Sequence, residues 1–183
     1  VTFDLTLANR VPDLLNEGYD VSIVLASELP DSGFVSQRLG ITYSIVCASP
    51  DYIARHGVPT RVADLASHTL IGFTQNDGLN QWPLRYAQGD RWPIQPAISA
   101  SSGETVRQLA LEGQGIACLS HFMTHEDISA GRLQVVLGEF NSGYRQPINA
   151  VYYRNSQLAL RIQCFLDFIQ SKLAAYASAD FKG

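Results

Sequence analysis

The residues best suited to chemistry surround the start of one predicted helix, in the stretch 101–111. Ser101, Ser102 and Thr105 flank the expected helix N-terminus, where backbone N–H groups lack intrahelical partners and the end of the helix dipole is positive. Such a place favours a carboxylate, sulfate or phosphate. In the alternative interpretation, one of the two serines only caps its own helix. Glu104 counts against a strongly anionic ligand, because its charge competes for the same positive end.

The glycine pair Gly113 and Gly115 raises the possibility of a nucleotide site. In a dinucleotide-binding fingerprint the glycines follow a strand and open a helix, so that the helix N-terminus meets the pyrophosphate. Here they follow a predicted helix and precede a predicted strand, which is the order of a helix C-cap and a tight return. We therefore expect no nucleotide and no other cofactor.

Two histidines four residues apart, His121 and His125, could share one face of a helix and bind a metal ion. A zinc hydrolase motif would place Glu directly after the first histidine, but Phe122 stands there. The chain offers no third ligand at a recognisable spacing. Structural or solvent-facing histidines are therefore favoured over a metal pair, and we expect no metal.

Two Ser-His neighbours, Ser120 with His121 and Ser67 with His68, place a hydroxyl beside an imidazole in the sequence. Adjacent residues rarely face each other, and the chain has no Gly-x-Ser-x-Gly nucleophile elbow. A triad assembled by the fold stays open as an alternative. The residues favour a binding wall over a catalytic set, and we expect no enzyme.

The composition is typical of a globular chain that does not bind nucleic acid by itself. Of its 183 residues, 46% are hydrophobic and 16% are charged, which fits a soluble protein with a substantial core. The net charge is −4 and the 13 basic residues are scattered, whereas phosphate binding depends on clustered Lys and Arg. No window approaches the ~18 to 20 apolar residues of a membrane span. The first residues lack the basic start and apolar block of a secretory signal, so we expect none.

The three cysteines, Cys47, Cys118 and Cys164, lie inside apolar stretches and are far apart. A disulfide framework would use an even, regularly spaced set. We therefore expect buried free thiols and a cytoplasmic protein.

The first 25 residues predict a βαβ unit. Apolar residues alternate over 1–8 and predict a strand; because it begins at the first residue without an initiator Met, we expect a fragment of a longer protein. A short helix over 11–17, closed by Gly18, and a strand over 21–25 follow. Strand, helix and strand at this spacing predict a parallel sheet.

The remaining pattern predicts short α/β units. The paired Trp-Pro steps within 81–94 predict an edge hairpin. Short parallel units separated by loops indicate an α/β fold with two lobes. Further helices are expected over 50–57, 60–67, 104–111 and 158–173, and further strands over 33–39, 41–48, 70–73, 97–100, 116–119, 132–137 and 149–153.

Several stretches resemble the LysR-type transcriptional regulators. The sequence DLLNEGYDVSI over 13–23 is similar to a helix, glycine and strand of that family, and CASPDYIARHG over 47–57 is similar to its Ala-Ser-Pro-x-Tyr segment. GQGIACLS over 113–120 is similar to the family's Gly-x-Gly-Ile-Ala-x-Leu-Pro, with Ser120 in place of the usual proline. The match stays in register over nearly the whole chain, including 64–73, 131–133 and 162–169.

The resemblance implies the C-terminal effector-binding domain of such a regulator, an α/β domain whose two lobes resemble type 2 periplasmic binding proteins. Lobe I would be 1–45 plus 150–183, without its first strand and helix, and lobe II would be 46–149. Crossover strands would fall near 44–46 and 148–150. The resemblance also implies homodimers or higher homo-oligomers, and contact with DNA only through an N-terminal helix-turn-helix that this stretch of sequence does not contain.

Within that resemblance, a small polar or carboxylated effector would lie in a cleft between the lobes. One cation, several hydroxyl groups, an aromatic wall and a positive helix end are compatible with such a molecule. A transport-type solute-binding protein of the same fold is the alternative. The residues expected to line the cleft are Asn9, Arg10, Phe73, Thr74, Ser101, Ser102 and Ser120.

Overall fold

The computed structural model describes residues 2–8, 13–25, 34–74, 78–153 and 159–177. The chain divides into two compact units. Among the described residues, unit 1 comprises those within 2–42 and 146–177, and unit 2 those within Tyr43–Arg145. These limits follow from packing alone, and the lobe limits implied by the resemblance stay a prediction.

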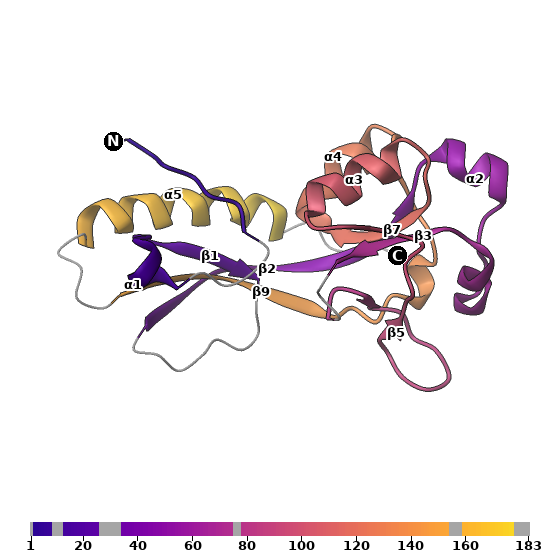
Figure 1. Ribbon diagram of the computed structural model, residues 1–183, viewed down its shortest axis with the longest axis horizontal. Helices are drawn as coiled ribbons and strands as arrows, with labels where there is room; N and C mark the ends of the chain where they lie inside the picture. The colour runs from indigo at the N-terminus through magenta and orange to yellow at the C-terminus, as the bar shows by residue number, and fades with distance from the viewer. Residues whose placement is uncertain (1, 9–12, 26–33, 75–77, 154–158, 178–183) are drawn as a thin grey trace. The chain divides into compact units, whose positions relative to one another are not determined.

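Unit 1 is a small sheet covered by one long helix (Figure 1). Strand β1 (Ser22–Leu25) pairs antiparallel with β9 (Arg145–Tyr153), which in turn neighbours β2 (Phe34–Ala48). The apolar face of α5 (Ala159–Ala177) packs on these strands, as its helical spacing predicts. The buried side chains of this core are Leu39, Ile148, Ala150, Ile162 and Leu166.

The short helix α1 (Leu14–Glu17) has the predicted caps at both ends. The backbone N–H of Asn16 donates to the Asp13 carboxylate at 3.2 Å, which satisfies one free donor of the first turn. Gly18 ends the helix with φ of 73°, a left-handed conformation that favours glycine. Residues 11 and 12, also expected in this helix, lie outside the described residues.

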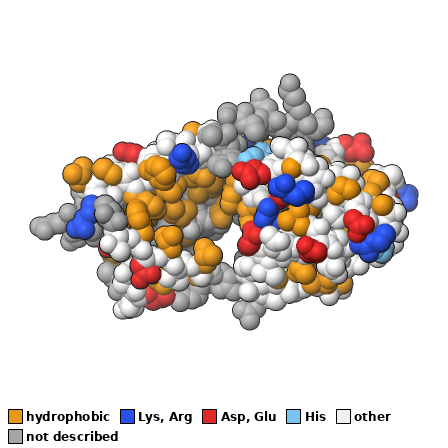
Figure 2. Space-filling model, turned by 90° about the horizontal axis from the view of Figure 1, so that it is seen from above, with side chains coloured by type: hydrophobic (Ala, Val, Ile, Leu, Met, Phe, Trp, Pro, Cys, Tyr) orange, Lys and Arg blue, Asp and Glu red, His pale blue; other side chains and the backbone are white. Residues whose placement is uncertain are grey.

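The strand predicted over 1–8 is wrong for the described residues 2–8, which form no strand. Phe3, Leu5 and Leu7 are 60%, 81% and 100% exposed. Figure 2 shows that hydrophobic side chains gather on the surface of the molecule. Alternation predicts a strand only where a neighbouring strand and a core receive it, and the described chain offers no such neighbour here. The βαβ unit is therefore also wrong, because β1 pairs antiparallel with β9.

The two strands predicted over 33–39 and 41–48 form one strand of 15 residues, β2. The glycine between them, Gly40, does not interrupt the ladder. A Cβ at this position would lie 3.7 Å from the Cβ of Leu173 in α5, an ordinary van der Waals contact, so Gly40 is packed beneath the helix within a continuous strand.

Unit 2 contains a mixed sheet of five strands, and helices pack on it (Figure 1). Its strands run in the order β8 (Gln134–Val135), β2, β7 (Ile116–Ser120), β3 (Leu70–Phe73) and β6 (Ile98–Ala100). The pairs β7–β3 and β3–β6 are parallel, whereas β2 pairs antiparallel with β7 and β8. A sheet with parallel pairs, together with the helices between its strands, confirms the predicted α/β class.

The helices and the hairpin of unit 2 follow the sequence pattern closely. The helical elements are α2 (Pro50–His56), the 3₁₀ helix η1 (Val62–Ser67), α3 (Gly103–Leu111), α4 (His121–Ser129) and the 3₁₀ helix η2 (Gly138–Phe140). The predicted hairpin is present, with β4 (Gln81–Trp82) antiparallel to β5 (Trp92–Pro93). Among them α4 has no apolar helical pattern, because its buried residues Thr124 and Asp127 are polar, and the spacing of His121 and His125 was the residue-level indication of it.

Two hydrophobic cores pack in unit 2. Cys47 belongs to one core and Cys118 to the other, although they lie on the neighbouring strands β2 and β7. Both are buried free thiols, as predicted. The expectation of burial is wrong for Cys164, which is exposed because it lies on the outer face of α5. No helix among the described residues is long and apolar enough to cross a membrane.

Candidate functional site

The carboxyl ends of three parallel strands meet at one edge of the unit 2 sheet. Phe73 at the end of β3 lies opposite Ala100 at the end of β6, and β7 runs parallel to β3. Thr74, Ser101, Ser102 and Ser120 occupy the positions at or just after these strand ends. In open α/β sheets this edge is where ligands bind. The fold therefore brings four of the predicted site residues to a single edge.

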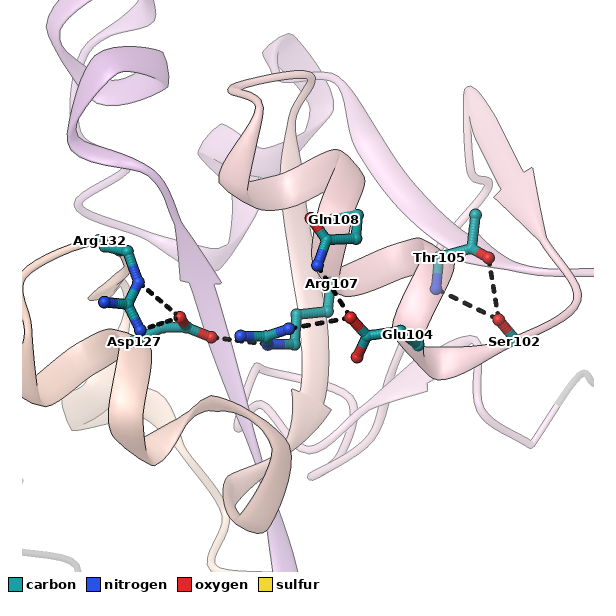
Figure 3. Close-up of polar contacts among 7 residues, drawn as sticks. All are labelled: Ser102, Glu104, Thr105, Arg107, Gln108, Asp127 and Arg132. Carbon is teal, nitrogen blue, oxygen red and sulfur yellow. Dashed lines mark hydrogen bonds and ion pairs between the residues drawn. The ribbon is translucent and has the colours of Figure 1, made fainter. Parts of the chain in front are cut away.

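Ser102 is the N-cap of α3 and remains exposed. Its Oγ accepts the backbone N–H of Thr105 at 3.2 Å and lies 2.9 Å from the Thr105 Oγ1 (Figure 3). Ser101, one residue earlier, is exposed as well. The capping interpretation is therefore confirmed for Ser102, and the cap leaves the end of the helix accessible to solvent.

The competing carboxylate of Glu104 is held by its own helix. Its Oε1 accepts from Arg107 Nη1 at 2.9 Å and from Gln108 Nε2 at 2.8 Å. Figure 3 shows Glu104 among these two partners, while Ser102 faces Thr105. Because one cation already neutralises Glu104, its charge opposes an anion at the helix end less than the sequence suggested.

A buried carboxylate anchors Arg107 in turn. Asp127 of α4 is fully buried and accepts from Arg107 Nε at 2.6 Å and from Arg132 Nη2 at 2.7 Å. Burial alone would raise the pKa of Asp127, but the hydrogen bonds and charges of Arg107 and Arg132 outweigh it and lower that pKa. Two carboxylates and two guanidinium groups thus form a network of zero net charge that joins α3, α4 and the turn after α4.

The other predicted site residues differ in how far they are exposed to solvent. Phe73 is half-buried in the core, and its backbone N–H and C=O bond the side chain of Asn80 at 2.8 Å each. Thr74 is exposed, and Ser120 is the half-buried N-cap of α4 without a side-chain cap bond. The predicted contacts Asn9 and Arg10 lie outside the described residues.

The Ser-His neighbours do not form the contact that nucleophilic catalysis requires. Ser67 Oγ donates to the backbone carbonyl of Asp64 at 2.8 Å, whereas Nδ1 of His68 lies 3.2 Å from the hydroxyl of Tyr52. The ring of His121 stacks on Tyr43. Among the described residues, no group of three or more His, Cys, Asp or Glu side chains is placed to hold a metal ion.

A cluster of rings lies beside Ser120, and no sequence pattern indicated it. The imidazole of His121 stacks on Tyr43 with centroids 4.8 Å apart and planes 13° from parallel. The guanidinium of Arg145 lies 5.3 Å from the centre of the same Tyr43 ring, and the His125 ring is 5.8 Å from that of His121. Burial, followed by the charge of His125, lowers the pKa of His121.

The sequence matches a known domain over almost its full length. The family model of the LysR substrate binding domain aligns with residues 1–174. The chain belongs to this family. The match confirms the resemblance that the motifs indicated, and the effector-binding domain of a LysR-type regulator is the identity it supports.

Known relatives of this LysR substrate-binding domain are transcriptional regulators. The chain is 43% identical over 171 residues to the HTH-type transcriptional regulator CrgA of Neisseria meningitidis serogroup C, covering 90% of this chain and 57% of the relative. It is 32% identical over 172 residues to DmlR of Escherichia coli, covering 92% and 54%. The chain therefore spans little more than half the length of these relatives.

Solved structures confirm the fold. The CrgA regulatory domain from Neisseria meningitidis superimposes with a TM-score of 0.82 at 42% identity, over 87% of this chain and 78% of that chain. The predicted two-lobed, type 2 periplasmic-binding-protein-like α/β fold is therefore confirmed. The alternative of a transport-type solute-binding protein finds no support, because the relatives are transcriptional regulators.

Proposed function

We propose that this LysR substrate-binding domain senses a small polar or carboxylated effector for a bacterial transcription regulator. The observation that carries the proposal is the convergence of Thr74, Ser101, Ser102 and Ser120 at the carboxyl edge of the unit 2 sheet in a chain of this family. Hydroxyl groups and the positive end of α3 are suited to the oxygen atoms of such a molecule. Asn9, Arg10 and Phe73 remain proposed contacts on the resemblance alone.

The charge of the helix end supports a carboxylated effector. Glu104 is paired with Arg107, and Arg107 is paired with the buried Asp127, so the first turn of α3 does not present a free acidic group. A carboxylate near Ser102 would therefore meet the dipole end and exposed hydroxyls with limited repulsion.

The wider role follows from the relatives. Because they are HTH-type regulators of which the match covers 57% and 54%, the whole protein is proposed to contact DNA through an N-terminal helix-turn-helix. It is also proposed to act in the cytoplasm as a homo-oligomer and to catalyse no reaction. An effector that favours one arrangement of the domain would shift the population toward it.

Thermodynamic linkage in the full-length protein tests the proposal. A ligand that raises the melting temperature of the domain should change the affinity of the full-length protein for its operator, and operator DNA should change the affinity for the ligand by the same factor, typically about 5- to 150-fold. Both affinities are measured by titration at one fixed salt concentration. A ligand that binds tightly without altering DNA affinity would point to solute binding instead of regulation.

A further inference from the structure

The two ends of unit 2 are joined through one aromatic ring. The chain enters the unit at Tyr43 and leaves it at Arg145. The guanidinium of Arg145 lies over the ring of Tyr43 at 5.3 Å, and the ring of His121, the first residue of α4, stacks on the same ring at 4.8 Å. The first and last residues of the segment Tyr43–Arg145 and the start of a helix therefore meet in one cluster.

The groups around His121 favour its neutral form. Tyr43 from β2 is 7% exposed and offers a phenol ring rather than a charge. Arg145 from β9 brings a positive charge to that ring, and His125 from α4 brings a second titratable imidazole. In the described part of the chain, no acidic side chain forms an ion pair with His121 or Arg145.

We propose that the His121–Tyr43–Arg145 cluster is a pH-sensitive clasp, in which neutral His121 holds both ends of unit 2 against α4 and protonated His121 releases them. The released state arises because an imidazolium would share the Tyr43 ring with a guanidinium and would face His125. This role is independent of the effector.

The attraction between the Tyr43 ring and a positive charge opposes the release of protonated His121. The face of Tyr43 attracts cations, by about 0.5–1 kcal/mol at exposed sites, and this would favour protonated His121. Arg145 already uses that attraction, and the imidazole is partly removed from water without an acidic partner. The lowered pKa of His121 has the direction that the proposal requires.

The sign of the pH effect follows from that direction. A histidine whose pKa is lower in the folded state than in the unfolded chain contributes its full stabilisation above the unfolded value, about 6.5. The contribution is lost as the pH falls below that value, because the unfolded chain then binds the proton more readily. The clasp is therefore closed at neutral pH and opens on acidification.

Nuclear magnetic resonance of the whole 183-residue chain between pH 7.5 and 5.0 tests the clasp. The His121 ring signals should titrate below about pH 6.5, and the Tyr43 ring signals should move with the same midpoint. His121→Phe retains a stacked ring without the charge and should abolish the movement of Tyr43. Arg145→Gln should raise the midpoint of His121.

His56→Phe is the matched control, because His56 stacks on Tyr52 at 4.4 Å in the same unit, and no described cation lies over that ring. It should leave the Tyr43 titration unchanged. A His121 midpoint at or above 6.5 in the wild-type chain would overturn the proposal whether or not the variants fold. Movement of the Tyr43 signals that persists in His121→Phe would overturn it as well.

Discussion

The buried carboxylate of Asp127 joins two arginines from different elements, so its removal takes the shared partner from Arg132 and leaves Arg107 paired with Glu104 alone. Losing the buried acceptor of hydrogen bonds from charged groups costs about 1.5–3 kcal/mol, because the guanidinium groups left behind are 20% and 54% exposed and remain partly hydrated. Asp127→Ala should therefore lower the free energy of unfolding in urea by that amount. Glu126→Ala, an exposed neighbour in the same helix, should change it by less than about 0.5 kcal/mol. Equal effects of the two substitutions would contradict the network.

The same residue predicts a pH dependence in the acid range. The pKa of Asp127 is lower in the folded protein than its ordinary value of about 3.9. Its stabilisation is therefore complete above that pH and is lost as the pH falls through the lowered folded value. Urea unfolding between pH 6 and pH 3 should show a shallower loss of stability in Asp127→Asn than in the wild type. Parallel curves would show that other carboxyl groups dominate.

The cysteines differ in reactivity because of where the sheet places them. Burial raises the pKa of the Cys47 thiol to about 12 and raises that of Cys118 as well, so neither forms a thiolate at neutral pH. An alkylating reagent at pH 8 should therefore add one label to the native chain, at Cys164, and three after unfolding, as counted by mass spectrometry. Cys164→Ser should remove the native label, and a second native label at a comparable rate would contradict the burial.

Among the helices and strands, the start of α3 depends on one side chain. Ser102→Ala removes the hydroxyl that accepts from Thr105 and should cost about 1 kcal/mol of stability. Ser102→Asp should cost less, because Asp is an equally good N-cap. Ser99→Ala, in the preceding strand with an exposed side chain, is the matched control. The values are compared by urea unfolding, and a Ser102→Ala loss no larger than that of the control would show that the cap carries no stability.

Elements with strong local signals were predictable from the sequence. Pro50 behind a serine cap, the Trp-Pro steps of the hairpin and the spacing of α5 all indicated elements that the structure contains. The wrong predictions have a common cause: whether a stretch forms a strand depends on a neighbouring element that its own sequence does not show. Residues 2–8 have the pattern of a strand but no described neighbouring strand. Gly40 suggests a break between two strands, but in the structure it lies within one strand and contacts Leu173 of α5.

The candidate site also contains residues that the sequence could identify and residues that it could not. Ser101 and Ser102 could be identified because a helix end is a local feature of the sequence. The clasp could not be identified from the sequence, because it joins residues 43, 121 and 145, which only the completed fold brings together. The neutralisation of Glu104 was missed for a related reason, since Arg107 is adjacent on the helix but its second partner, Asp127, comes from α4.

The molecule as a whole is proposed to be a domain that binds a small effector at the carboxyl edge of the unit 2 sheet. Ser102→Asp is the sharpest variant for testing this, because it retains the cap but adds a negative charge where a carboxylate is expected. Ser129→Asp adds the same charge at an exposed position at the end of α4 and serves as its control.

The decisive experiment is a thermal-shift screen of the wild-type domain and these two variants against small organic acids, amino acids, aromatics and sugars. A ligand at 100 times its dissociation constant adds roughly 2.7 kcal/mol, which for a chain of this size raises the melting temperature by about 5–11 °C. We expect a carboxylated ligand whose shift is lost in Ser102→Asp and retained in Ser129→Asp. A ligand whose shift is the same in all three proteins would contradict the proposed site.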